Sequence, residues 1–157
     1  MEKIVERLAS YHLFNYVLPG FLVLLCYFYL SDLSNSSYNL VVLFVLAYFC
    51  GLFISRVGSL ILEPTLKKTG FIRFAKIEEY INAAKKDAKI ETLMETANMY
   101  RSLIVVSLFA VVLASFLKVD YVLIIAGGVS FIVFLFSYRK QIGYIVARVE
   151  GAENAKK

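Results

Sequence analysis

Four runs of apolar residues alternate with polar segments along the chain. The runs cover about residues 13–30, 40–62, 102–117 and 121–137. Apolar residues follow one another within each run, without the two-residue alternation of a barrel strand, and this pattern favours helices. A helix needs roughly 20 apolar residues to cross the hydrocarbon layer of a bilayer. The pattern therefore predicts an all-α integral membrane protein with four transmembrane helices in two hairpins.

Polar segments beside the second, third and fourth runs carry apolar residues at helical spacing, and they predict cytoplasmic helical extensions. In the insert 64–101, Phe74, Ile77, Ile81 and Ala84 recur on one face. We expect this first stretch, from about residue 71, either to lie flat on the membrane surface or to pack on the other extensions.

A second stretch begins near Asp87, which can cap a helix, and it runs without a break into the third apolar run. The segment 138–157 continues the fourth run as a C-terminal helix and tail. Apolar stripes mark one face of each extension, formed on the second stretch by Ile90, Leu93, Met94 and Ala97 continuing toward Ile104, and on the last segment by Tyr138, Ile142, Ile145, Val146 and Val149. The two long helices would then form a paired stalk outside the membrane.

The composition supports a single membrane domain. Of the 157 residues, 60% are hydrophobic and 18% are charged. Ordinary soluble domains are about 45–50% apolar and about 25% charged. A soluble enzyme, a disordered chain and a disulfide scaffold are therefore poor descriptions of this sequence.

The positions of the basic residues predict the topology. Lys and Arg occur in the amino-terminal stretch, in the insert and in the tail, whereas residues 31–39 contain none and the turn near residue 118 contains one. Basic residues favour the cytoplasmic side. Both termini and the insert are therefore expected in the cytoplasm.

Residues with catalytic chemistry are nearly absent. The single histidine, His12, stands at the edge of the first run, and no Cys/His group has the spacing of metal ligands. No phosphate-binding loop, dinucleotide fingerprint or nucleophile–histidine–acid set is present in the sequence. We therefore expect neither enzymatic activity nor a cofactor.

Small residues recur every four positions on the second apolar run. They are Ala47, Gly51, Ser55 and Ser59. Small residues at this spacing let two helix backbones approach closely inside a membrane. The contact lies either within one subunit or between subunits of a homo-oligomer.

Two charged residues lie near the cytoplasmic end of the same run. Arg56 stands about two turns before the end, and Glu63 follows seven residues later. A charge at the bilayer centre costs about 2.5–3.5 kcal/mol on insertion scales, and less near an end. Arg56 either reaches the headgroups with its long side chain or faces a carboxylate or a wet cavity, where it would affect ion passage or subunit pairing.

The first and fourth runs contain residues that interrupt regular helix packing. Pro19 has no N–H to donate to the carbonyl group of Asn15, four residues earlier, and this predicts a kink, either static or acting as a gating hinge. Gly127 and Gly128 belong to a patch of small residues that permits close packing or lines a narrow pore.

Basic residues of the insert lie close to the predicted membrane surface. They are Lys67, Lys68, Arg73, Lys76, Lys85, Lys86 and Lys89. Each gains about 1 kcal/mol beside an anionic leaflet. Alternatively they bind an anionic ligand, a nucleotide or oligonucleotide, and a symmetric oligomer would repeat them as a positive ring.

Two stretches of the chain resemble a group of bacterial proteins. The run from His12 to Gly20 looks like the first helix of small membrane subunits of anti-phage defence operons, as does the run from Arg56 to Pro64 continuing to Asn98–Arg101. The Hailong-like form implies an oligomeric ion-channel effector controlled by a nucleic-acid messenger. The Kiwa-like form implies an oligomeric membrane sensor that engages a soluble DNA-binding partner.

These observations lead to two functional hypotheses. The first is an oligomeric effector in the bacterial inner membrane, channel-like or membrane-perturbing, gated through its cytoplasmic helices by an anionic ligand or a partner protein. The second is a non-conducting anchor or sensor that docks a soluble DNA-binding or enzymatic partner.

Overall fold

The computed structural model describes residues 13–30, 39–117 and 121–154. Outside them lie the amino-terminal stretch with His12, the connections within the two hairpins and the last three residues of the predicted tail. The described residues are predominantly helical and contain no strand, so the predicted all-α class is confirmed.

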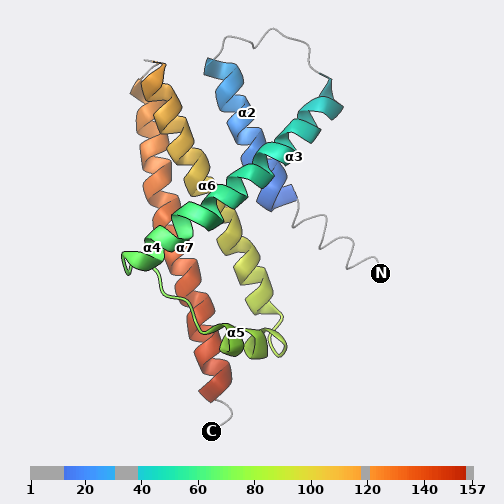
Figure 1. Ribbon diagram of the computed structural model, residues 1–157, viewed down its shortest axis with the longest axis vertical. Coiled ribbons are helices and arrows are strands. Elements are labelled where there is room, and N and C mark those ends of the chain that lie inside the picture. The colour runs from blue at the N-terminus through green and yellow to red at the C-terminus, as the bar shows by residue number, and fades with distance from the viewer. Residues whose placement is uncertain (1–12, 31–38, 118–120, 155–157) are drawn as a thin grey trace.

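The helices follow the apolar runs closely, and Figure 1 shows their arrangement. In chain order they are η1 (Leu13–Val17), α2 (Leu18–Leu30), α3 (Leu40–Val57), η3 (Gly58–Leu62), α4 (Glu63–Lys68), α5 (Ile77–Ala84), α6 (Lys89–Phe116) and α7 (Tyr121–Asn154). The two η elements are single π-helical turns that continue directly into the next α-helix.

Three of the described helices are long and apolar enough to cross a membrane. They are Leu40–Lys68, Lys89–Phe116 and Tyr121–Ala152. The apolar helix Leu13–Tyr29 is shorter. It extends about 26 Å at 1.5 Å per residue, slightly less than the roughly 30 Å of hydrocarbon. The prediction is thus confirmed in part: the described chain is helical, and three of its helices are long and apolar enough to span a membrane. Membrane insertion and a fourth span stay predictions.

The two predicted hairpins are present and they pack on each other. Helices α6 and α7 lie side by side along their length, and α3 crosses them obliquely (Figure 1). Helices α2 and α3 contact each other, and both also contact α6. The end of α2 and the ends of α6 and α7 that connect to each other lie at the same end of the molecule, which fits the predicted topology (Figure 1).

Helices α6 and α7 continue unbroken beyond the apolar runs, as the sequence predicts. Helix α6 begins at Lys89, and α7 extends to Asn154. Asp87 accepts a hydrogen bond from the backbone N–H of Lys89 over 3.0 Å, so it caps the start of α6. We call the half of this helix pair that lies beside α5 the stalk.

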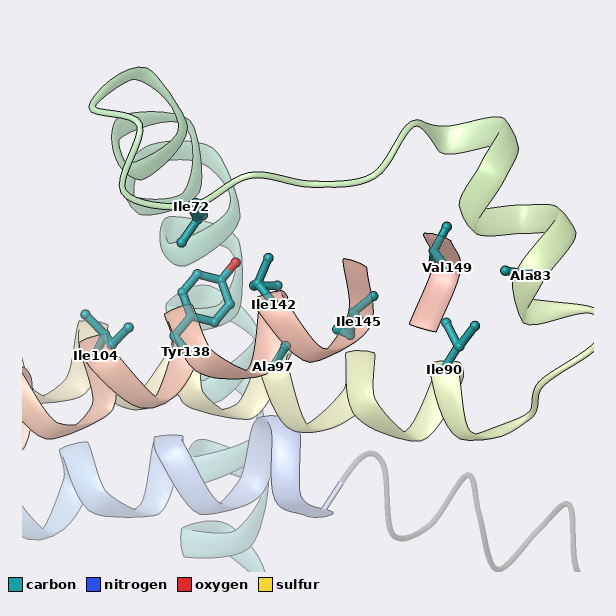
Figure 2. Packing of buried hydrophobic residues seen from close by; sticks show 9 residues of the cluster. All are labelled: Ile72, Ala83, Ile90, Ala97, Ile104, Tyr138, Ile142, Ile145 and Val149. Atoms are coloured by element: carbon teal, nitrogen blue, oxygen red, sulfur yellow. The ribbon is translucent and has the colours of Figure 1, made fainter. Parts of the chain in front are cut away.

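A cluster of large side chains fills the stalk and extends toward the first hairpin (Figure 2). Ile90 and Ile104 of α6 and Tyr138, Ile142 and Val149 of α7 are each at most 2% exposed. Their burial removes apolar surface from water, which stabilises the fold by about 25 cal/mol per Å². The sequence places these residues on the stripes that face each other, so the core of the stalk follows from the pattern.

Helix α5 packs on the stalk, against α7 and α6, rather than standing apart from it. The structure therefore favours one of the two predicted arrangements. The predicted stripe is only partly correct, because Ile77 and Ile81 are 77% and 46% exposed while Ala83 is buried. The small side chain of Ala83 lets α5 approach the stalk closely, and this contact turns the two isoleucines outward.

The helix predicted from about residue 71 begins later, at Ile77. Gly70 has a φ of +70°, a conformation that glycine adopts readily, and residues 71–76 form a linker without regular secondary structure. Ile72 in this linker is 3% exposed and belongs to the buried cluster (Figure 2). Burial of Ile72 therefore holds the linker against α7.

Candidate functional site

A largely buried ion pair joins the two hairpins where the apolar runs end. Arg101 of α6 donates a hydrogen bond from Nη1 to Oε2 of Glu63 over 2.7 Å, and the side chains are only 12% and 19% exposed. Tyr138, a residue 1% exposed, lies beside this pair and interacts electrostatically with both charged groups. We call Glu63, Arg101 and Tyr138 the boundary cluster.

Each residue of the boundary cluster directly flanks an apolar run. Glu63 follows the second run, Arg101 precedes the third, and Tyr138 follows the fourth. The boundary cluster therefore brings together the end of the first hairpin and both helices of the second.

Additional cations and polar groups surround the boundary cluster. Lys67 lies one helical turn after Glu63 and binds its carboxylate over 2.9 Å. The Nζ atom of Lys67 also lies 4.2 Å from the centre of the Phe74 ring. Within the described residues, Nε of Arg101 and Oγ of Ser102 are buried without a hydrogen-bond partner.

The backbone before Glu63 is shaped by Pro64. Proline has no N–H to donate to the carbonyl four residues earlier, and its ring crowds that carbonyl. The chain forms a π-helical turn over Gly58–Leu62, in which the N–H of Glu63 binds the carbonyl of Gly58, five residues back. This extra residue rotates Glu63 by about 100° relative to Arg56.

Gly58 leaves room for Arg101 to reach Glu63. A Cβ atom at Gly58 would lie 3.1 Å from Cγ of Arg101 and 3.4 Å from its Nε. The arginine stem therefore runs directly over the glycine, and a larger residue there would push it away from the carboxylate.

Arg56, predicted beside Glu63 as a gating or pore residue, is exposed and forms no ion pair with any described residue. Glu63 binds Arg101 and Lys67 instead. The rotation by the π-helical turn explains this separation. An outward direction of Arg56 is consistent with the interpretation in which its side chain reaches the lipid headgroups.

The residues singled out on the first helix lie in its contact with the rest of the protein. Asn15 is 3% exposed and belongs to the π-helical turn η1, and Pro19 is fully buried. The helix changes from π to α geometry between Val17 and Leu18, close to the predicted irregularity. Its role as a gating hinge stays a prediction.

The small-residue ladder on α3 forms a contact within the chain. Ala47 is fully buried, and a Cβ atom added at Gly51 would lie 1.7 Å from the carbonyl oxygen of Tyr16. Gly20 of α2 faces the same place, because its added Cβ would lie 1.8 Å from the carbonyl oxygen of Ala47. The last two residues of the ladder in chain order, Ser55 and Ser59, are only half-buried.

The two glycines on α7 differ in their surroundings. A Cβ atom added at Gly127 would lie 2.7 Å from Cγ2 of Val111 on α6, whereas one at Gly128 would meet nothing within 4 Å. Gly127 therefore permits close packing of α6 and α7, and Gly128 faces away from that contact.

The seven basic residues predicted to bind an anionic ligand fall into two groups within one chain. Lys67, Lys68, Arg73 and Lys76 lie on α4 and the linker, and Lys85, Lys86 and Lys89 lie between α5 and the start of α6. Lys89 lies 12 residues before Arg101 on α6, which is about 18 Å along the helix. Two of the seven are engaged by acids, Lys67 by Glu63 and Lys76 by Glu79. A shared ligand for all seven stays a prediction.

Two polar contacts hold the far half of the stalk. Arg148 of α7 donates a hydrogen bond from Nε to Asp87 over 2.8 Å, and Gln141 of α7 donates one to the carbonyl of Leu93 on α6. The bond from Arg148, together with that from the N–H of Lys89, lowers the pKa of the Asp87 carboxyl below its usual value. These contacts keep the relative position of α6 and α7 fixed.

Sequence reasoning missed the pairing of Glu63 with Arg101 and the role of Tyr138. Arg101 is 38 residues from Glu63, and helical spacing relates only neighbours on one helix. One signal could have indicated the contact. Glu63, Arg101 and Tyr138 each flank an apolar run on the side predicted to face the cytoplasm, so all three are expected at the same membrane surface.

Neither the described side chains nor known proteins assign a site to this chain. Within residues 13–30, 39–117 and 121–154, no three His, Cys, Asp or Glu side chains gather as a metal site. A scan against protein-family models, a search of curated proteins and a search of solved structures each found no match to this chain.

Proposed function

We propose that the protein is a non-enzymatic membrane effector that assembles with copies of itself into a channel-like complex controlled by its cytoplasmic helices. The observation that carries this proposal is the boundary cluster, which ties the first hairpin to both stalk helices. Because α6 and α7 run unbroken from the apolar region into the stalk, a displacement of the stalk also moves the contact with Glu63.

Low burial in the apolar helices supports assembly. Only 17% of the most apolar stretch of Leu40–Lys68 is buried within the chain, and 11% of that in Tyr121–Ala152. A cavity of about 500 Å³ beside α2, α3 and α6 is lined by apolar residues such as Phe49, Ile54 and Phe109, and it offers ions no polar groups. A conducting path would therefore have to form between copies, from surfaces that one chain leaves uncovered.

Ion flux through reconstituted protein tests the proposal. We expect the wild-type protein in liposomes to carry a cation or anion flux that changes when the boundary cluster is broken by Arg101→Gln. Lys140→Gln is the matched control, because it removes one positive charge from an exposed position two residues after Tyr138. An oligomer in mild detergent together with altered flux only in Arg101→Gln supports the proposal, and a stable monomer without flux contradicts it.

The resemblance to subunits of anti-phage defence operons extends the proposal to that setting. Cells that express the protein with its neighbouring genes should reduce phage plaque numbers and lose membrane potential on infection. Protection that is equal in wild type and Arg101→Gln would contradict a role for the boundary cluster in the response.

A second candidate function is a non-conducting anchor or sensor for a soluble partner. It is favoured by Ile77 and Ile81, which lie one turn apart on α5 and are exposed at the end of the stalk. Exposed apolar residues that lie together are frequent at protein interfaces. Replacing Lys85, Lys86 and Lys89 with Glu separates the two candidates, since a channel should change its gating, whereas an anchor should lose its partner and carry no current in either form.

A further inference from the structure

A groove separates the linker from α7, just beyond the end of the fourth apolar run. It has a volume of about 370 Å³ and is lined on the linker by Gly70–Arg73 and on α7 by residues between Arg139 and Glu150. Ligand sites of this size are common, since pockets for small molecules span about 300–1,000 Å³.

The linker that forms one wall is fixed in place. The backbone N–H groups of Phe71 and Ile72 both bind the carbonyl of Leu66, and the side chain of Ile72 is buried beside Tyr138 and Ile142 (Figure 2). The ring of Phe71 meets the edge of Phe136 on α7 at 5.9 Å between ring centres. The groove is therefore part of the folded structure.

The opposite wall, on α7, includes two small residues. Gly143 and Ala147 lie one helical turn apart on α7 and line the groove. A Cβ atom at Gly143 would meet nothing within 4 Å, so the space beside it is empty of protein atoms.

The electrostatics of the groove favour an anion at the end nearest the apolar run. Arg73 and Arg139 line it, and neither forms an ion pair with any residue that the structure describes. The guanidinium of Arg139 lies 4.9 Å from the centre of the Phe71 ring, a cation–π contact that orients it without neutralising its charge. Glu150 lies 11 residues after Arg139, about 16 Å further along α7, so its charge acts at the other end.

We propose that this groove binds an anionic phosphate group, with Arg73 and Arg139 as its ligands. Arginine presents several donors in a planar arrangement that matches phosphate oxygens. Arg139 comes two residues after the end of the fourth apolar run. In the predicted topology this position lies at the depth of the headgroup phosphates. The phosphate belongs to an anionic phospholipid or to a soluble nucleotide that approaches from the cytoplasm.

This inference goes beyond the proposed conductance and does not depend on it, because binding is measured without a current. The purified full chain in mild detergent is titrated with phosphatidylglycerol, with zwitterionic phosphatidylcholine and with ATP, and bound molecules are counted by native mass spectrometry. We expect Arg73→Gln with Arg139→Gln to weaken binding of the anionic probe about tenfold. Lys140→Gln removes one positive charge from an exposed position next to Arg139 that does not line the groove, and it should leave binding nearly unchanged.

A second pair of variants tests the groove itself rather than its charge. Gly143→Leu should fill the groove and abolish binding, while Gly151→Leu, also with nothing within 4 Å of an added Cβ on the same helix, should not. Preference for phosphatidylglycerol over phosphatidylcholine assigns the phosphate to lipid, and binding of ATP with the same dependence on both arginines assigns it to a nucleotide. Equal binding by the arginine variant and its lysine control, or full binding by Gly143→Leu, would overturn the proposal.

Discussion

The contact between α2 and α3 differs from the contact between α6 and α7 in the atoms that meet. In the first, backbone meets backbone, since added Cβ atoms at Gly20 and Gly51 would lie within 2 Å of carbonyl oxygens. In the second, large side chains interlock, and Tyr138, Ile142 and Val149 are almost completely buried.

The difference corresponds to the surroundings that we expect for each contact. Lipid tails are as apolar as leucine, so helices inside a membrane associate through close van der Waals packing of small residues. In water, helices associate by removing apolar side chains from solvent. The first hairpin should therefore be sensitive to added atoms, and the stalk to removed atoms.

Removal of atoms from the stalk should have the largest effect. Ile142→Ala leaves a cavity between α6 and α7, and we expect a loss of about 3 kcal/mol in the free energy of unfolding. Ile132→Ala, on the same helix but 54% exposed, is the control and should lose far less. Chemical denaturation in detergent, followed by circular dichroism, measures both. Equal losses would show that the stalk does not depend on its buried side chains.

Addition of one carbon atom to the first hairpin should have the next largest effect. Gly51→Ala places a Cβ atom against the backbone of Tyr16, so the two helices must separate, and we expect a loss of about 2 kcal/mol. In Gly128→Ala the new atom meets nothing within 4 Å. Thermal unfolding of the two variants gives the comparison, and unchanged stability of Gly51→Ala would mean that the backbones are not in contact.

Acid should weaken the far half of the stalk, with the smallest effect. The pKa of Asp87 is lower in the folded protein than its usual value of 3.8, because Arg148 and the N–H of Lys89 donate to the charged form. The stabilisation is therefore present at neutral pH and disappears as pH falls through that lowered pKa. Asp87→Asn should therefore reduce the fall in melting temperature that occurs as the pH drops through the lowered pKa of Asp87. Glu78→Gln, an exposed acid on α5, should retain it.

The helices and the core of the stalk could be predicted from the sequence because they depend on short-range periodicity. The apolar runs locate α2, α3, α6 and α7, and the stripe from Tyr138 to Val149 identifies the buried face of α7. The close approach at Ala47 and Gly51 could also be predicted, and the structure places it within one chain.

The boundary cluster and the face of α5 could not be predicted in the same way. Glu63 binds Arg101 only because η3 rotates it away from Arg56 and because α3 crosses α6 at the right level. Ile77 and Ile81 resemble a buried stripe, yet Ala83 makes the contact because a small residue allows closer packing. Both outcomes depend on how helices cross, which local spacing does not specify.

The π-helical turn between Gly58 and Leu62 has a consequence for chain length. Such a turn is equivalent to a one-residue insertion in a regular helix. A deletion of one residue here would restore uniform helical geometry, but it would also shift the register of everything that follows by about 100°. Glu63 would then point away from Arg101. The number of residues between the start of the second apolar run and Glu63 therefore matters for the ion pair as much as the identities of Glu63 and Arg101.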